Sequence, residues 1–450
     1  MERPAVMKIL LISSNICVDP YPVYPLGMSV VASALAKEGE DVKQFDILPE
    51  GMEGLRALLS AETFDLIGIS IRNIDLVNSV RENAEIIRTP MEIIRICREL
   101  SSAPVFLGGA GFTLLPEVIM DCSGADFGIA GEGEEAVIEL VRTLRAGKKP
   151  PRILRRRTSC QLPALYDRNI LRYYAEKTHM IPVQTKRGCP CRCTYCTYPS
   201  LEGHEFRNRE QDGVFRQLAE LHEEFPGSLF FFVDSIFNDP CGEFRDFVRA
   251  MHEQCGRIPF TCFVTPWRLS EDDIELLCAC GMTAADVGAD AASDATLRGI
   301  GKFFTFDDVR RCVRHLFERG VGTSCSVMIG GPGETYDTIR EGIGNLRSLG
   351  KASTSVFSGI RILPGTELYE LAKTKGKIPP DWNGIDSLYY FEDGLDRARV
   401  HDMLLEAFGN DPYIIYPPDR QNRILRTIHR IGYLKFRESA PGGRSGEGAS

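Results

Sequence analysis

Four cysteines of the chain lie within one short segment. The segment reads Lys186-Arg-Gly-Cys-Pro-Cys-Arg-Cys-Thr-Tyr-Cys196, with thiols at Cys189, Cys191, Cys193 and Cys196. Cysteine thiolates are the usual ligands of iron–sulfur clusters. The first, third and fourth of these cysteines have the spacing C-x3-C-x2-C, which allows one loop to bind three corners of a four-iron cubane. The fourth corner would then remain free for a small bidentate molecule.

Cys191 leaves an alternative open. Two close C-x-C pairs could bind zinc, which usually has four ligands in structural sites. The sequence offers no second ligand pair and no nearby histidine pair to complete a tetrahedral site. We therefore expect the cluster, with Cys191 outside its ligand set. Most of the other cysteines lie singly in apolar stretches and are expected to be small buried hydrophobic residues.

The elements around the cysteine segment predict a barrel over residues 181–380. Strand patterns alternate there with helical patterns. The expected strands are 182–186, 228–234, 259–265, 284–290, 322–329 and 353–362, and the expected helices are 212–224, 242–254, 270–281, 306–320 and 336–349. Six such units predict a partial (β/α)6 barrel, whose active site lies at the carboxyl ends of its strands. The cysteine segment directly follows the first strand.

Residues 1–150 predict a separate α/β domain. Strand patterns at 8–13, 42–46, 65–70, 104–107 and 125–130 alternate with helical patterns at 26–38, 51–60, 91–100, 115–120 and 134–146. This order predicts a doubly wound, Rossmann-like (flavodoxin-like) parallel sheet with helices on both faces. A ligand of such a sheet binds in the loops beyond the carboxyl ends of its strands.

The remaining segments predict connections and surface features. The basic stretch 148–157 indicates a linker between the two domains. We expect this linker to span residues 151–180. Residues 381–437 predict a small helical C-terminal region, and 438–450 a disordered tail. Within that region, 420–437 is basic and apolar, so it could lie on a membrane surface or pack on the barrel.

Composition and charge exclude several classes of protein. The net charge of −9 argues against a general nucleic-acid binder. No apolar run is long enough to span a membrane. The N-terminus lacks the cleavage site of a signal peptide, so a cytoplasmic location is expected.

The cysteine segment resembles that of the radical S-adenosylmethionine (SAM) superfamily, C-x3-C-x-aromatic-C, with Tyr195 as the aromatic residue. The resemblance implies a 4Fe-4S cluster on Cys189, Cys193 and Cys196 whose free iron binds the amino and carboxylate groups of SAM. One-electron reduction then yields methionine and a 5′-deoxyadenosyl radical. An external reductant of the flavodoxin or ferredoxin type is therefore expected.

Later segments resemble the SAM site of that family. They are Val233-Asp-Ser, Gly288-Ala-Asp290, Met328-Ile-Gly-Gly-Pro-Gly-Glu-Thr335 and Gly359-Ile-Arg-Ile-Leu-Pro-Gly-Thr366. The first departs from the family's Gly-Gly-Glu-like pattern. The SAM-binding residues that the resemblance implies are Tyr195, Asp234, Ser235, Asp290, Gly330, Gly331, Arg361 and Leu363.

The α/β domain followed by this barrel resembles the cobalamin-binding class of the superfamily. The matching stretches are Tyr24-Pro-Leu-Gly-Met28, Leu107-Gly-Gly-Ala110 and Gly131-Glu-Gly-Glu-Glu135. The cobalamin-binding residues implied are Ser70, Arg72, Asn73, Gly108, Gly109, Gly131, Glu132 and Gly133.

One departure concerns the cobalt ligand. Many cobalamin proteins have a D-x-H-x-x-G loop after the first strand, but no histidine precedes His179 here. We expect cobalamin to bind without a histidine ligand (His-off), with Arg72 or Asn73 covering its lower face. The alternative is a scaffold that has lost cobalamin.

With both cofactors, the resemblance implies methylation of an unactivated carbon in a small-molecule or lipid-like substrate. A cyclase or rearrangement enzyme without methyl transfer is an alternative. A non-catalytic iron–sulfur electron-transfer protein is another, but electron carriers usually have four cysteines per cluster. A methylthio-group transferase would usually bring N-terminal cysteines for a second cluster, and Cys17, Cys97 and Cys122 are isolated.

Overall fold

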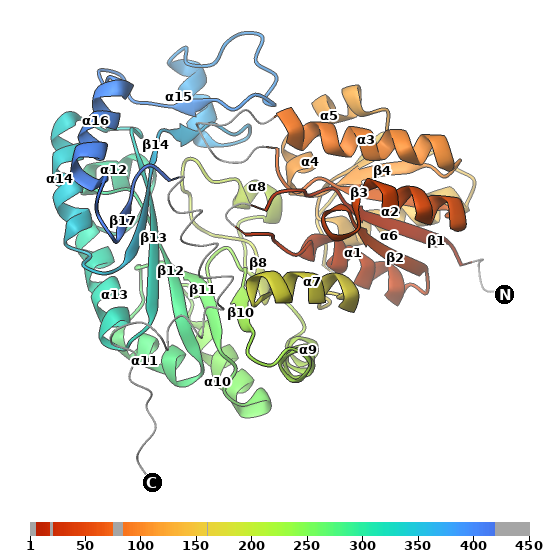
Figure 1. Cartoon of the computed structure of the whole chain (residues 1–450), viewed down its shortest axis with the longest axis horizontal. Helices are drawn as coiled ribbons and strands as arrows, with labels where there is room; N and C mark the ends of the chain where they lie inside the picture. The colour runs from red at the N-terminus through yellow and green to blue at the C-terminus, as the bar shows by residue number, and fades with distance from the viewer. Residues whose placement is uncertain (1–5, 19–20, 75–83, 160, 419–450) are drawn as a thin grey trace.

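Two parallel sheets organise the chain (Figure 1). The computed structural model describes residues 6–18, 21–74, 84–159 and 161–418. Over these residues the first sheet has the strand order β2-β1-β3-β4-β5-β6, and the second has the order β17-β14-β13-β12-β11-β10-β7. The predicted class, an α/β chain with a doubly wound first domain and a partial barrel, is confirmed.

The first sheet is buried on both faces, as expected for a parallel sheet. On β1, Ile9 and Leu11 pack with α1 and α6, whereas Leu10 and Ile12 pack with α2 and α3. The strands are β1 Lys8–Ser13, β2 Asp41–Asp46, β3 Leu66–Ser70, β4 Val105–Gly108 and β5 Phe127–Gly131. The helices are α1 Leu26–Lys37, α2 Ile47–Ala61, α3 Ala84–Leu100, α4 Ala110–Leu114, α5 Pro116–Ser123 and α6 Gly133–Arg145.

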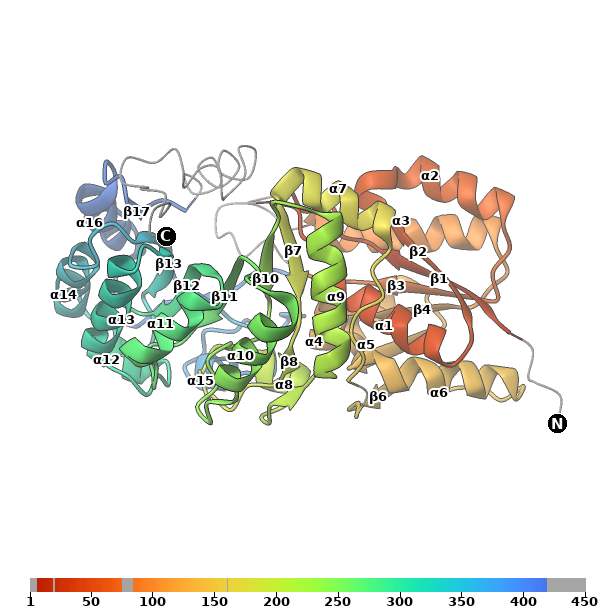
Figure 2. The same cartoon turned by 90° about the horizontal axis from the view of Figure 1, so that it is seen from below.

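The expected linker differs from the structure. Its basic stretch contains strand β6, Ile153–Arg156, which pairs in parallel with β5 and adds an edge to the first sheet. The exposed Arg155 and Arg156 give this edge strand its linker-like sequence, because charged side chains commonly protect sheet edges. Helix α7, Arg168–Thr178, then lies at the junction of the two sheets (Figure 2).

The second sheet is an open barrel with its helices outside (Figure 1). Every neighbouring pair of its strands is parallel. The strands are β7 Met180–Val183, β10 Leu229–Phe232, β11 Phe260–Val264, β12 Met282–Asp290, β13 Gly322–Ile329, β14 Ser353–Ser358 and β17 Ile414–Ile415. The helices are α9 Gln211–Glu224, α10 Glu243–Cys255, α11 Glu271–Ala279, α12 Asp294–Gly299, α13 Phe306–Glu318 and α14 Tyr336–Arg347.

The C-terminal region also differs from the expected helical cap. It contributes helix α16, Arg397–Phe408, but its strand β17 pairs with β14, so the described barrel has seven strands instead of six. The expected strand 353–362 is broken at Gly359, whose φ is 81°. Beyond the break, β15 (Ile360–Arg361) pairs antiparallel with β16 (Tyr389–Tyr390). Helix α15, Glu367–Thr374, lies between them.

In the structure, the expected strand 182–186 is likewise divided between two strands, β7 and β8. After β7 ends at Val183, β8 (Lys186–Arg187) pairs antiparallel with β9 (Arg207–Asn208). Helix α8, Tyr198–Glu202, lies between β8 and β9. The expected features at 420–437 and 438–450 lie outside the described residues. In the described part of the chain, no helix is long and apolar enough to cross a bilayer.

Candidate active site

The cysteine segment forms a loop at the carboxyl end of the first barrel strand, as predicted. We call residues 189–196 the cluster loop. Its backbone is held from three sides: Cys189 N–H donates to Gly203 O at 3.0 Å, Thr194 N–H to Ile300 O at 3.0 Å, and Leu368 N–H to Thr194 O at 2.7 Å. The loop is therefore fixed by parts of the barrel that are distant in sequence.

The thiols of the cluster loop lie close enough to affect one another. Burial raises the pKa of Cys193, and it raises the pKa of Cys196 to about 12. A hydrogen bond with Cys191 lowers the pKa of Cys189 to about 7. The described residues contain no group of three His, Cys, Asp or Glu side chains arranged for a single metal ion. A cubane whose fourth iron is left free for a small molecule needs three thiolates, one on each of the other irons, and Cys189, Cys193 and Cys196 match that number.

Lys302, which the sequence analysis missed, is a cation that lies beside these thiols. Its ammonium is nearly buried and forms an ion pair with Asp290, the last residue of β12. Burial opposes its charge, but the Asp290 carboxylate and the Cys193 thiol raise the pKa of Lys302 above its usual value. Burial raises the pKa of the Tyr195 hydroxyl, and the nearby Asp290 carboxylate raises it further. The structure thus brings together two predicted site residues, Tyr195 and Asp290.

Asp234 and Ser235, two predicted residues that follow β10, form hydrogen bonds to the segment just before the cluster loop. The fully buried Asp234 accepts hydrogen bonds from Thr185 N at 2.7 Å, Thr185 Oγ1 at 2.5 Å and Lys186 N at 3.1 Å. The Ser235 hydroxyl donates to Gly188 O at 2.6 Å. Their contact with SAM stays a prediction, because in this structure these groups position the start of the cluster loop.

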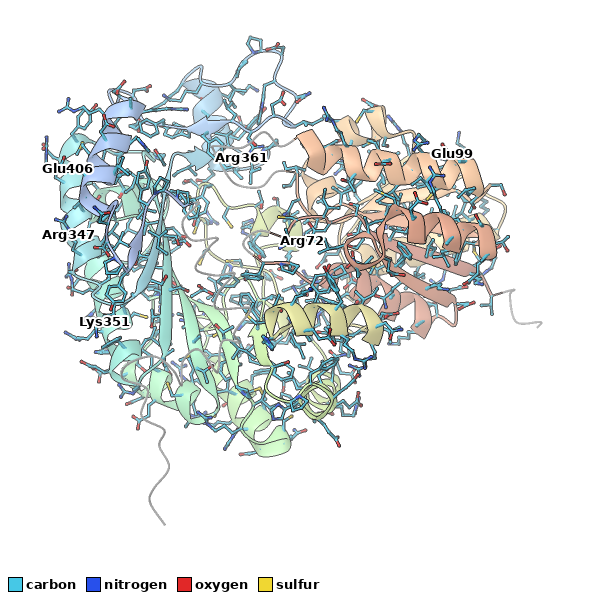
Figure 3. The ribbon with its side chains drawn as sticks, viewed as in Figure 1. Arg72, Glu99, Arg347, Lys351, Arg361 and Glu406 are labelled. Atoms are coloured by element: carbon cyan, nitrogen blue, oxygen red, sulfur yellow. The ribbon has the colours of Figure 1, made fainter. Side chains whose placement is uncertain are left out.

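The other predicted SAM residues lie farther along the barrel. A Cβ at Gly330 would lie 2.6 Å from the Phe391 ring, and one at Gly331 would lie 2.7 Å from Ile360. The Arg361 guanidinium is buried with β15 and β16, where it donates to the carbonyl of Ile362 (Figure 3). Leu363 packs against the hydrophobic core of the first domain. Arg361 therefore stabilises the backbone around β15 and β16. Leu363 packs the barrel against the first domain.

A cavity of about 380 Å³ lies between the first domain and helix α8, which follows the cluster loop. It opens at the carboxyl ends of β1, β3, β4 and β5, where a ligand of a doubly wound sheet binds. From the barrel side it is lined by Tyr198, Leu201 and Glu202 of α8. From the first domain it is lined by the predicted residues Ser70, Arg72, Gly108, Gly109, Gly131, Glu132 and Gly133. Asn73 instead lines a small adjoining pocket, together with Arg72 and Cys17.

Two glycines leave room beside the backbone in the wall of this cavity. A Cβ at Gly27 would have no atom within 4 Å, and one at Gly108 would approach only the Ile129 carbonyl, at 3.8 Å. Backbone at both positions therefore faces open space. Among the described residues that line the cavity there is no histidine. Arg72 is exposed and lies beside α8 in the middle of the molecule (Figure 3).

Buried ion pairs join the cavity rim to the barrel. Arg187 contacts Glu134 at 2.7 Å and Glu132 at 3.4 Å. Arg207 contacts Glu132 at 2.6 Å, and Arg209 contacts Glu134 at 3.5 Å. We call these five residues the interdomain clamp. Glu132 therefore lines the cavity while its carboxylate is bound by Arg187 and Arg207.

The fold and site together define a class: an α/β domain with an interdomain cavity, followed by a barrel that presents a three-thiolate loop. Two family models match the chain, the B12 binding domain over residues 15–141 and the radical SAM superfamily over residues 183–343. The chain is a radical SAM enzyme with a cobalamin-binding domain, as the sequence predicts. The matched families define its cofactors: SAM and an iron–sulfur cluster in the barrel, and cobalamin in the first domain.

The chain is similar over most of its length to curated methyltransferases. It is 25% identical to the tryptophan 2-C-methyltransferase of Streptomyces laurentii, covering 76% of this chain and 71% of that protein. It is 21% identical to the cytidylyl-2-hydroxyethylphosphonate methyltransferase of Streptomyces wedmorensis, covering 86% and 85%.

Solved structures share the fold. The radical SAM methyltransferase TsrM from Kitasatospora setae, determined with cobalamin and a [4Fe-4S] cluster, matches with a TM-score of 0.81 at 23% identity and covers 95% of this chain and 96% of its own. The cobalamin-dependent SAM radical enzyme OxsB, with aqua-cobalamin and SAM bound, matches with a TM-score of 0.71 at 15% identity, covering 98% and 74%.

Proposed function

We propose that the chain is a cytoplasmic, cobalamin-dependent methyltransferase that adds a methyl group to an unactivated carbon of a small molecule. One observation carries the proposal: the cavity of the first domain opens onto the segment that follows the cluster loop. Tyr198, Leu201 and Glu202 line the same cavity as Gly108 and Gly131. The cavity expected to hold cobalamin is therefore bordered by residues on both sides of the cluster loop in the sequence, Arg187 before it and Tyr198 after it.

When bound, the cluster supplies the electron that cleaves SAM, and cobalamin carries the methyl group. Cys189, Cys193 and Cys196 would hold the cluster, and Arg72 would cover the lower face of the corrin in the absence of a histidine. The curated relatives described above are named methyltransferases, which supports methyl transfer over cyclisation or rearrangement. A reductant of the flavodoxin or ferredoxin type would deliver the electron.

The test is anaerobic reconstitution of the purified chain with iron, sulfide and hydroxocobalamin. We expect one corrinoid per chain by ultraviolet–visible spectroscopy and cleavage of added SAM under reducing conditions. Counting 5′-deoxyadenosine, S-adenosylhomocysteine and methylated product per turnover separates methylation from cyclisation. Absence of stoichiometric corrinoid would overturn the cobalamin part of the proposal.

Substitution of the three predicted ligands gives a sharper test. In the variant Cys189→Ala, Cys193→Ala, Cys196→Ala, we expect SAM cleavage to fall by about 100-fold or more, because loss of metal ligands costs metal affinity and activity. Cys241→Ala is the matched control, since Cys241 is an exposed thiol outside the cluster loop. Iron content and cleavage by this control should equal those of the wild type. Cleavage at the native rate by the triple variant would contradict the proposal.

A further inference from the structure

An exposed aromatic pair lies beside the cluster loop. The loop is hydrogen-bonded to the turn after α12, where Thr194 N–H donates to Ile300 O. In the same turn Phe303 is 58% exposed, although the next residue, Phe304, is buried. The Phe303 ring lies 5.8 Å from that of Trp267, which follows strand β11 at the same end of the barrel. Apolar side chains that are exposed together, unlike single ones, mark sites of interaction with another molecule.

Three arginines lie on the segments that meet at this pair. The Arg268 guanidinium lies 4.8 Å from the centre of the Trp267 ring, which is a cation–π contact. Arg298 is the last but one residue of α12, and its carbonyl accepts the hydrogen bond of Gly301 N–H at 3.0 Å. A Cβ at Gly301 would lie 2.5 Å from the carbonyl oxygen of Arg192, within the cluster loop. The three segments therefore meet at one rim of the barrel.

The charge of this rim is positive. All three arginines are exposed, and none of them forms an ion pair with a residue that the structure describes. The segments 189–196, 266–269 and 295–304 contain no acidic residue, in a chain whose net charge is −9. Their remaining cation, Lys302, is paired with Asp290. The arginines are therefore free to pair with acidic groups of another molecule.

The rim is also close to the expected cluster. Phe303 directly follows Lys302, which lies beside the thiols of the cluster loop, and Arg192 belongs to that loop. Complexes that transfer electrons are commonly small and transient, so a few side chains suffice to form one. Opposite charges on the two surfaces raise the rate at which such partners associate.

We call Arg192, Trp267, Arg268, Arg298 and Phe303 the docking patch. We propose that the docking patch binds the protein that reduces the cluster, and that this protein is an acidic flavin carrier of the flavodoxin type. This inference rests on the proposed function and specifies its reductant. Carboxylates of the carrier would pair with the arginines, and the apolar edge of its flavin ring would lie against Phe303. One electron passes from the reduced flavin to the cluster, and no bond of the chain is made or broken.

The experiment measures cluster reduction by stopped-flow absorbance, so it does not depend on SAM cleavage. The reconstituted holoprotein is mixed anaerobically with pre-reduced bacterial flavodoxin and, separately, with dithionite. In the variant Arg268→Gln, Arg298→Gln we expect the second-order rate constant with flavodoxin to fall by about tenfold at low salt, because charges across an interface chiefly govern association. The rate with dithionite should change little, since a small ion needs no docking surface.

Arg249→Gln, Arg314→Gln is the matched control. Both of these arginines are exposed, on α10 and α13, and each pairs with an acidic residue of its own helix. The rate constants of this control should equal those of the wild type. Added salt should slow the flavodoxin reaction of the wild type and of the control more than that of the docking-patch variant, because salt screens exposed charges.

A second variant separates the ring contact from the charge contacts. Phe303→Ser should slow the flavodoxin reaction several-fold and leave its salt dependence and the iron content unchanged. Equal flavodoxin rates in the wild type and the arginine variant, no salt dependence in the wild type, or a parallel loss with dithionite would each overturn the inference. Faster reduction by a ferredoxin would overturn the choice of a flavin carrier. Absence of corrinoid, or of SAM cleavage with dithionite, in the wild type would instead overturn the proposed function.

Discussion

The ion pair between Lys302 and Asp290 places a fixed charge beside the cluster loop. Lys302 interacts electrostatically with all four cysteines of that loop. Asp290 adopts a φ of 62°, a conformation that is uncommon outside glycine. Strained residues of this kind cluster at functional sites. The pair is therefore suited to adjust the electrostatic potential at a cluster bound by these thiols.

Replacement of Lys302 by Met should make the reduction potential of the cluster more negative. Removal of a nearby positive charge disfavours the added electron, and the unpaired Asp290 carboxylate acts in the same direction. We expect a shift on the order of 50–100 mV. An anaerobic redox titration followed by electron paramagnetic resonance measures it.

Lys302→Arg is the matched control, because it keeps the charge and should shift the potential much less. Circular dichroism should give the same secondary structure for both variants. A potential for Lys302→Met equal to that of the wild type would contradict the electrostatic role of this residue.

Among the elements, the turn that follows α12 holds the cluster loop in place. Gly301 in this turn has a φ of 78°, and a Cβ there would lie 2.5 Å from the carbonyl oxygen of Arg192. The Ile300 carbonyl accepts the hydrogen bond from Thr194. Only glycine allows the backbone of this turn to approach the loop so closely.

Gly301→Ala should push the turn away from the cluster loop and reduce the iron content of the reconstituted protein several-fold. Gly376→Ala is a close control, since Gly376 also has a positive φ, 65°, but a Cβ there would meet no atom within 4 Å. Iron and sulfide analysis compares the two. Similar iron contents would show that the loop does not depend on this contact.

The sequence predicted elements well where buried apolar runs are long. The expected strand 8–13 coincides with β1, because its apolar side chains are covered on both faces. Strand β17 was missed, since two residues give no periodicity, and only its pairing with β14 defines it. Strand β6 was missed because Arg155 and Arg156 are exposed at the sheet edge.

The site was predicted less completely than the fold. The three cysteines are near each other in sequence, so their spacing alone indicates a shared ligand. Lys302 could not be found in this way, because it reaches the cluster loop only through the folding of β12 and the turn after α12. The role of Arg361 at SAM stays a prediction; in this structure its guanidinium donates to the backbone carbonyls of Ile362, Leu388 and Gly384.

At the scale of the whole molecule, the interdomain clamp joins the two domains. Glu134 is only 1% exposed and lies between Arg187 and Arg209. Burial removes water from all three charges, so each depends on the others for stabilisation. Removal of one partner from a buried ion pair leaves an uncompensated charge, which costs about 3–5 kcal/mol.

Glu134→Gln should therefore lower the midpoint of thermal unfolding by several degrees. Glu139→Gln is the matched control, because Glu139 forms an exposed ion pair with Arg156, and such pairs contribute about 1 kcal/mol or less. Differential scanning calorimetry of the two variants compares these costs. Equal midpoints would mean that the clamp does not stabilise the interface.

Arg187 precedes Cys189 by two positions, and the glutamates that bind it border the cavity for the corrin. A ligand bound in this cavity should therefore restrict motion of the cluster loop, and a cluster bound by the loop should restrict motion of the cavity rim. A chain reconstituted with iron and sulfide alone should then hold its cluster less firmly than a chain that also binds cobalamin.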